Sequence, residues 1–101
     1  MIRHIVMWKL KEYAEGADRL SNAQKMKTLL QACAAIVPGI LRFDVALAQD
    51  GLESTSDVVF YAEFVDKNTL DAYQAHPQHQ ALKPFFAAVR EGRQCMDTFF
   101  E

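Results

Sequence analysis

Residues 2–10 alternate in a way that predicts a β-strand, because successive side chains of a strand point to opposite faces of a sheet. One face would carry five side chains of mainly apolar character: Ile2, His4, Val6, Trp8 and Leu10. The opposite face would carry Arg3, Ile5, Met7 and Lys9. Neither face is wholly polar, so the pattern indicates a strand that needs cover on both sides.

A first helix is expected after a loop that contains a glycine. Ser21 and Gln24 have the spacing of a capping box, and Asp18 offers an alternative start one turn earlier. Apolar side chains then recur at helical period between residues 20 and 37. The dipeptide Pro38-Gly39 follows, and we expect the helix to end there.

Two further strands are expected, over residues 40–48 and about 57–65. In the first of them, four apolar side chains would share one face: Leu41, Phe43, Val45 and Leu47. The dipeptide Asp50-Gly51 then gives a strong turn signal, which predicts a hairpin-like connection. The second strand is apolar on both faces, which is typical of a central strand.

The next segment is expected to hold a broken helix. Asp66 can cap a short helix, and Pro77 disfavours helical geometry at His76, so the helix should stop or kink there. A second helical stretch would start at Pro77 and bury one stripe of apolar side chains: Leu82, Phe85, Phe86 and Val89. Pro84 predicts a kink or a restart around Lys83.

A final strand is expected over residues 93–100, after the helical stretch ends near Gly92. The element order is then β-α-β-β-α-β, that of the ferredoxin-like α+β fold, in which an antiparallel sheet carries both helices on one face. The other face would stay bare. Because the strands at 2–10 and 57–65 are apolar on both sides, we expect a second copy of the chain to cover it as a homodimer.

Composition narrows the class of protein. The 101 residues fit one domain, residues 1–101, and the net charge is −2. Lysines and arginines are scattered, so we expect no nucleic-acid partner and no membrane partner. No stretch approaches the ~20 apolar residues of a membrane span, and residues 1–11 lack the features of a signal peptide. The two cysteines, Cys33 and Cys95, form no motif, which favours a cytoplasmic protein with reduced thiols.

Reactive side chains gather where the helical region breaks, in the string Tyr73-Gln74-Ala75-His76-Pro77-Gln78-His79. Tyr73 and His79 fall on core-facing positions by helical spacing, and His4 lies on the more apolar face of the first strand. If a helical turn starts at Pro77, its N-terminus disfavours a charged imidazole and keeps His79 available as a neutral base. With Tyr73 as hydrogen-bond donor, the set suits proton abstraction next to a carbonyl.

Other interpretations of the same string stay open. A His-Pro pair at a helix break is often only a capping turn, with half-buried Tyr and His side chains whose polar atoms bond to the backbone. Metal binding by His4, His76 and His79 is disfavoured, because a proline interrupts the His-x-x-His spacing and no carboxylate is placed nearby. We therefore expect no metal, and the absence of a glycine-rich phosphate loop leads us to expect no cofactor.

The chain resembles the stress-responsive A/B barrel (Dabb) family along its whole length. The resemblance rests on Asp97 in the last strand and on three strings: Ile2-Arg3-His4-Ile5-Val6, Val37-Pro38-Gly39-Ile40 and Tyr73-x-x-His76-Pro77-x-His79. It implies a ferredoxin-like protomer in a face-to-face homodimer, which is a dimeric α/β barrel.

The resemblance also implies functions. The best-understood relative type is a plant polyketide cyclase, whose catalytic Tyr and His fall on Tyr73 and His79 and whose pocket-lining His falls on His4. We expect His76 and Trp8 to line the same pocket. The sequence does not decide whether the chain is an enzyme, and three functions stay open. The first is a small-molecule pocket with polyketide-cyclase-like acid/base chemistry on a carbonyl compound, the second a non-enzymatic stress-response or assembly protein, and the third a cofactor-free monooxygenase-like enzyme.

Overall fold

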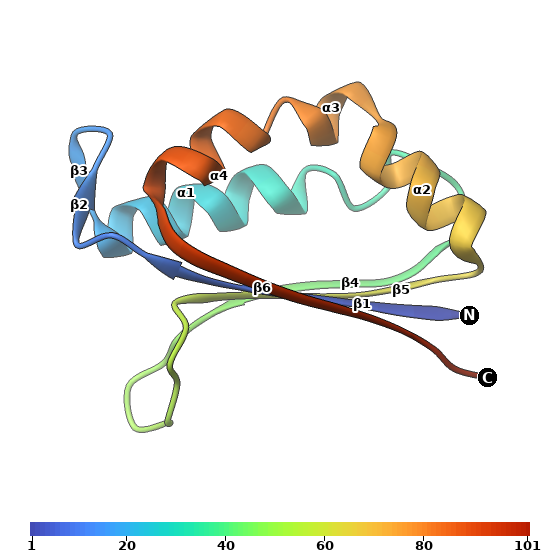
Figure 1. The fold of residues 1–101 in the computed structure, drawn as a ribbon, viewed down its shortest axis with the longest axis horizontal. Coiled ribbons are helices and arrows are strands. Elements are labelled where there is room, and N and C mark those ends of the chain that lie inside the picture. Colours follow the sequence, from blue (N-terminus) through green and yellow to red (C-terminus); the bar gives the residue numbers. More distant parts are fainter.

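The sheet and the helices form two layers (Figure 1). The computed structural model describes all 101 residues, and its antiparallel four-stranded sheet has the order β4-β5-β1-β6. The strands are β1 (Ile2–Leu10), β4 (Ile40–Leu47), β5 (Val58–Phe64) and β6 (Arg90–Phe99). The helices, all on one face of the sheet, are α1 (Arg19–Gln31), α2 (Lys67–Ala75), α3 (Pro77–Gln80) and α4 (Lys83–Val89). This arrangement confirms the expected ferredoxin-like α+β fold.

The core lies between the helices and the sheet. β1 and β5 are the two inner strands, and every second residue of β1 from Ile2 to Leu10 is buried. On β5 the buried residues also alternate: Val58, Phe60, Ala62 and Phe64. The strand that the sequence predicted to be central is therefore central. Only two polar residues are buried, His4 and Asn22.

α1 starts at the earlier of its two expected caps and ends sooner than expected. The Asp18 carboxylate accepts a hydrogen bond of 2.8 Å from a backbone N–H in the first turn. The helix ends at Gln31, although the apolar period predicted helix as far as Val37. Residues 32–36 form tighter turns, in which the Cys33 N–H donates to the carbonyl three residues back. The approaching proline disfavours helical geometry at Val37, so the helix does not resume.

A small hairpin takes the place of the loop expected before α1. β2 (Tyr13–Ala14) and β3 (Ala17–Asp18) pair around Glu15 and Gly16, whose φ values are 52° and 76°. Two positive φ values mark a type I′ turn, which suits the twist of paired strands. The buried Asn22 amide ties the hairpin to α1 by donating to the Ala14 carbonyl at 2.9 Å.

The second helical region breaks twice, at the positions that its prolines predicted. His76 has φ −62° and ψ 136°, which is extended backbone, so α2 ends there and α3 begins at Pro77. α4 restarts at Lys83 with Pro84 in its first turn, where a missing N–H costs no helical hydrogen bond. None of the helices has the length and apolar character needed to cross a membrane.

β6 begins earlier than expected. It starts at Arg90, directly after α4, so the helix end predicted near Gly92 and the strand predicted over 93–100 are both displaced. The register between β1 and β6 shifts between Lys9 and Leu10. Such a bulge bends the edge strand, and the chain can then pass from helix to sheet without a loop.

Leu41 lies outside the apolar face that its spacing predicted. The register between β4 and β5 shifts between Ile40 and Arg42, and Leu41 is exposed. Beyond the shift, Phe43 and Val45 turn toward the helices as expected. One irregular position therefore changes the face of one residue and leaves the rest of the strand in place.

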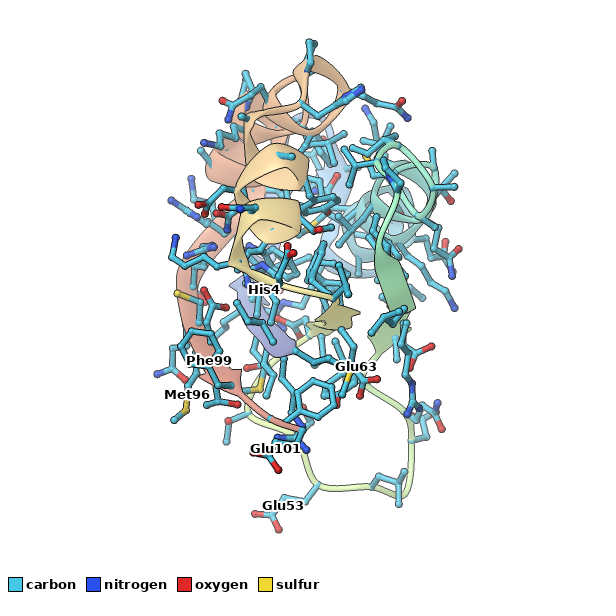
Figure 2. All side chains as sticks on the ribbon, turned by 90° about the vertical axis from the view of Figure 1, so that its right-hand side faces the viewer. His4, Glu53, Glu63, Met96, Phe99 and Glu101 are labelled. Atoms are coloured by element: carbon cyan, nitrogen blue, oxygen red, sulfur yellow. The ribbon has the colours of Figure 1, made fainter.

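The face of the sheet opposite the helices has no cover within the chain (Figure 1). We call it the open face, and its apolar side chains are Ile5, Met7, Val59, Tyr61 and Met96. Met96 is 64% exposed and Met7 38% exposed. Figure 2 shows Met96 projecting from β6, away from the helices. Side chains of this kind on a bare sheet are typical of a surface that packs against another layer.

A close approach at Gly39 gives a testable prediction. Gly39 has a φ of 92°, and a Cβ there would lie 2.9 Å from both the Thr69 hydroxyl oxygen and a Val65 methyl. Gly51 has a φ of 85° and open space around it, so it is the matched control. We expect Gly51→Ala to lower the free energy of unfolding by about 1 kcal/mol through backbone strain, and Gly39→Ala by about 2 to 3 kcal/mol through strain and a clash. Urea unfolding measures both, and equal losses would contradict the close approach of Thr69 and Val65 to Gly39.

Candidate functional site

A cavity of about 390 Å³ lies between the core side of the sheet and the helices. Its apolar wall is made by Val6, Trp8, Leu30, Phe60, Leu82 and Phe86. Trp8 meets Phe86 edge-on, with ring centroids 5.5 Å apart, and this pair closes one part of the wall. A space of this size, mainly apolar with a few polar groups, suits a small organic molecule.

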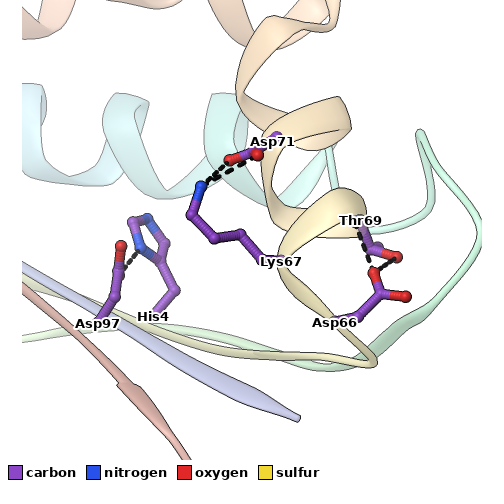
Figure 3. Close-up of polar contacts among 6 residues, drawn as sticks. All are labelled: His4, Asp66, Lys67, Thr69, Asp71 and Asp97. Carbon is purple, nitrogen blue, oxygen red and sulfur yellow. Dashed lines mark hydrogen bonds and ion pairs between the residues drawn. The ribbon is translucent and has the colours of Figure 1, made fainter.

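His4 lines the cavity and is paired with Asp97. The Nδ1 of His4 lies 2.5 Å from the Oδ1 of Asp97 (Figure 3), and the two side chains are 4% and 44% exposed. They meet because His4 on β1 stands opposite Asp97 on β6 in the antiparallel register. A proton on Nδ1, donated to the carboxylate, fixes the tautomer and leaves Nε2 of His4 as a hydrogen-bond acceptor. The pair is therefore an oriented imidazole with a carboxylate behind it.

His79 lines the same cavity in its uncharged form. Its ring packs against Tyr73 with centroids 4.6 Å apart, and its Nδ1 is buried without a hydrogen-bond partner. Burial, together with the nearby charges of Lys83, His4 and Arg93, lowers the pKa of His79 to about 4. The sequence attributed a neutral imidazole to the dipole of a helix. α3 has only four residues, and the stronger cause is burial.

Tyr73 lies behind His79 and does not line the cavity. Its ring is fully buried and packs against Phe43, Phe60 and Phe64, at centroid distances of 5.9, 6.2 and 5.3 Å. Its hydroxyl is buried without a hydrogen-bond partner. Burial raises the pKa of this phenol, so it keeps its proton and is a hydrogen-bond donor at any physiological pH.

His76 lies at the helix break, outside the residues that line the cavity. Its Nδ1 accepts a hydrogen bond of 3.1 Å from the backbone N–H of Gln78 and so caps α3. The Tyr-x-x-His-Pro-x-His string is therefore divided in space. Of the five site residues expected from the sequence, the structure brings His4, Trp8 and His79 to the cavity wall, and it places Tyr73 one layer behind.

Three cationic side chains at the cavity were not anticipated: Lys83, Arg90 and Arg93. The sequence held two signals for them. Lys83 follows His79 by four residues, and Arg93 shares its strand face with Asp97 by alternation. Neither signal was sufficient by itself, because the place of Lys83 depends on where α4 restarts, and the places of Arg90 and Arg93 depend on the start of β6 and its register on β1.

Outside this cavity the other candidate groups stand alone. Cys33 is buried, and burial raises the pKa of its thiol, whereas Cys95 is exposed on β6. No three His, Cys, Asp or Glu side chains converge as the ligands of a metal ion would.

The buried neutral state of His79 predicts how stability depends on pH. Its folded pKa of about 4 lies below the ordinary value of 6.5, so on acidification the unfolded chain takes up the proton first. The contribution to stability is complete above about pH 6.5 and is lost as the pH falls toward 4. After a discount for partial exposure, we expect a loss of about 2 kcal/mol.

A series of urea unfolding curves at different pH values, for the wild type and for His79→Asn, measures this loss. Asparagine carries no proton that titrates in this range, so the variant should lose about 2 kcal/mol less than the wild type on acidification. If the free energy of unfolding falls by the same amount in both proteins on acidification, the buried neutral imidazole is contradicted. Both proteins share all other titrating groups, so only the difference between them is interpreted.

Comparisons with known proteins agree with this fold. The family model described as Stress responsive A/B Barrel Domain (Dabb) matches residues 2–100. A crystal structure of a dimeric protein of unknown function with a ferredoxin-like fold, from Bacteroides fragilis, is 27% identical with a TM-score of 0.82, over 98% of this chain and 95% of that one. A Dabb family protein from Mesorhizobium loti is 22% identical with a TM-score of 0.74, over 99% and 96% of the two chains.

A more distant likeness has the same fold. A putative antibiotic biosynthesis monooxygenase from Nitrosomonas europaea is 17% identical with a TM-score of 0.78, over 99% of this chain and 98% of that one. Comparison with the curated proteins gives no match. Because the family model spans nearly the whole sequence, the chain belongs to the stress-responsive A/B barrel (Dabb) family.

Proposed function

We propose that the chain forms a homodimer in which each cavity binds a small carbonyl compound and carries out acid/base chemistry on it. One observation carries this proposal. Two buried polar atoms without a protein partner, the Nδ1 of His79 and the hydroxyl oxygen of Tyr73, lie on adjacent rings. His79 lines the cavity together with His4, which is paired with Asp97.

Unpartnered polar atoms are costly in a stable core. Leaving a buried donor or acceptor without a hydrogen bond costs about 1 to 3 kcal/mol, and a catalytic role or a bound molecule is one explanation for such a group in a native protein. Here two of them are neighbours, because the Tyr73 and His79 rings are in contact. A ligand oxygen in the cavity is a suitable partner for a group on this wall.

The base in this proposal is His4. Its Nε2 accepts a proton while its Nδ1–H is held by Asp97, and the carboxylate stabilises the imidazolium that forms. His79, the base expected from the sequence, is less suited to that role, because a pKa of about 4 lies well below the pH at which it would act. The proposal therefore gives the proton transfer to His4 and another role to His79.

His79 and Tyr73 supply the polarising groups. A neutral imidazole carries one N–H, which can donate to a carbonyl oxygen and stabilise the enolate that forms when His4 removes a proton from the adjacent carbon. Tyr73 contacts the His79 ring from behind, so we assign it a positioning role, with its hydroxyl available to hold that ring. Its raised pKa keeps this hydroxyl protonated throughout.

Exchange of α-protons tests this chemistry without knowledge of the natural substrate. Neutral and carboxylated aryl methyl ketones are incubated with the protein in heavy water, and proton NMR follows the loss of the methyl signal. We expect the wild type to accelerate exchange of at least one ketone by about tenfold or more over buffer. His4→Asn, Asp97→Asn and His79→Asn should each reduce that acceleration by about 10- to 100-fold.

The control is His76→Asn, which changes a histidine of the same string that lies outside the cavity and keeps a side chain able to cap α3. It should leave exchange unchanged. Tyr73→Phe keeps the ring packing and removes only the hydroxyl. A change in how the exchange rate of this variant depends on pH would reveal the positioning role. If no ketone exchanges faster with the wild type than with His79→Asn, the acid/base function is contradicted and the non-enzymatic alternative is favoured.

The homodimer is supported by the open face. Ile5 and Met7 on β1 and Met96 on β6 lie on a sheet surface that no element of the chain covers. The Bacteroides fragilis protein, which shares this fold over almost its whole length, is described as dimeric. A second copy whose sheet faces the first would remove these side chains from water in a symmetric interface.

A charge on the open face tests the dimer. We expect Ile5→Lys to dissociate the dimer or to unfold the chain, because a lysine would be desolvated in the interface. Leu20→Lys introduces the same charge at an exposed position on α1 and should leave the oligomeric state unchanged. Sedimentation at several concentrations gives the mass of each protein, and a stable folded wild-type monomer at low concentration would contradict the dimer.

A further inference from the structure

We infer that the ligand of the cavity is an anion with an apolar body, and that a carboxylate or comparable oxyanion on it is held by Lys83, Arg90 and Arg93. This inference rests on the proposed function of the cavity as a ligand site. It adds the charge of the ligand, and the place where that charge is held.

The charge around the cavity has one sign. Three cationic side chains line it, and no aspartate or glutamate does. The chain as a whole is acidic, with a net charge of −2, so this excess of positive charge is local. A cleft lined by charges of one sign attracts ligands of the opposite sign, and its low-dielectric walls strengthen that field.

None of the three cations is neutralised within the chain. The ion pairs of the structure join other residues: His4 to Asp97, Arg42 to Asp44 and Lys67 to Asp71. Asp97, the partner of His4, shares the strand face of Arg93 but lies four residues further along β6, which is about 13 Å. Arg93 instead stands opposite Trp8 in the register with β1.

The three cations come from segments that adjoin in the sequence. Lys83 begins α4, Arg90 joins α4 to β6, and Arg93 follows on β6. Guanidinium groups suit carboxylates and other oxyanions because their N–H donors can bind two oxygens at once. Arg93 stands opposite Trp8 and Arg90 opposite Leu10, toward the end of β1, whereas His4 lies near its start. The two arginines therefore mark one pole of the cavity, and His4 marks the other.

The wall between these two poles is apolar. Along β1, Val6 and Trp8 lie between His4 and Leu10, the residue that pairs with Arg90 of β6. Phe86 meets Trp8 edge-on, with ring centroids 5.5 Å apart. A ligand that uses both poles must therefore carry its anionic group several bonds away from the carbonyl that reacts, with an apolar part between them. A bound anion would also offset the Lys83 and Arg93 charges that act on His79.

Two dyes that differ in a sulfonate test the charge preference. Anilinonaphthalene sulfonate is the anionic probe and phenylnaphthylamine is its uncharged counterpart, and both gain fluorescence in an apolar site. We expect the sulfonate dye to bind the wild type about tenfold more tightly. Lys83→Gln and Arg93→Gln should each lower the affinity for the sulfonate dye by about three- to tenfold and leave the affinity for the uncharged dye unchanged. Both side chains are exposed, so the fold should tolerate the change.

Lys9→Gln is the matched control, because Lys9 is exposed on β1 next to Trp8 but on the opposite face of the sheet. It should change neither affinity. Equal affinities of the two dyes for the wild type, or equal effects of all three substitutions, would overturn the anionic ligand and leave the cavity as a site for neutral molecules. Failure of both dyes to bind would overturn the ligand site itself, and with it the proposed function.

Discussion

The His76–Pro77 bond constrains the whole site, because a proline disfavours helical backbone at the residue before it. The covering layer over the sheet cannot be one straight helix, and the chain instead forms α2, α3 and α4 in an arc (Figure 1). The cavity lies under this arc, with His79 on its wall and His76 used as a cap.

The cavity places polar groups where the surroundings are otherwise apolar. His4 is one of only two buried polar residues, and its partner Asp97 reaches it from the neighbouring edge strand. His79 has no such carboxylate, and burial together with cations keeps it uncharged. Two histidines in one cavity thus have opposite environments, an arrangement that separates the roles of base and hydrogen-bond donor in our proposal.

Much of this fold could be predicted from local patterns in the sequence. Alternation over residues 2–10 predicted both faces of β1, and the prolines predicted the two breaks of the covering helices. The predictions were wrong where contacts between residues distant in the sequence decide the structure. The end of α1 at Gln31, the start of β6 at Arg90 and the exposure of Leu41 depend on turns and bulges that no local period records.

The candidate site was predictable only in part, for the same reason. Helical spacing and strand alternation found His4, Trp8 and His79, which line the cavity. The pairing of His4 with Asp97 and the place of Arg93 require the register of β1 on β6, and the place of Arg90 requires the early start of β6. His76 shows the converse, because its place in the string gives no sign that its ring nitrogen bonds to the backbone.

Nitrogen NMR of the histidine side chains tests the central claim most directly, and the chain has only three histidines to assign. At about pH 5.5, below the ordinary histidine pKa, the account predicts that His79 is still uncharged. At about pH 8 it predicts that His4 carries its proton on Nδ1, toward Asp97, with Nε2 unprotonated. A charged His79 in the first condition, or a His4 with its proton on Nε2 in the second, would contradict the account.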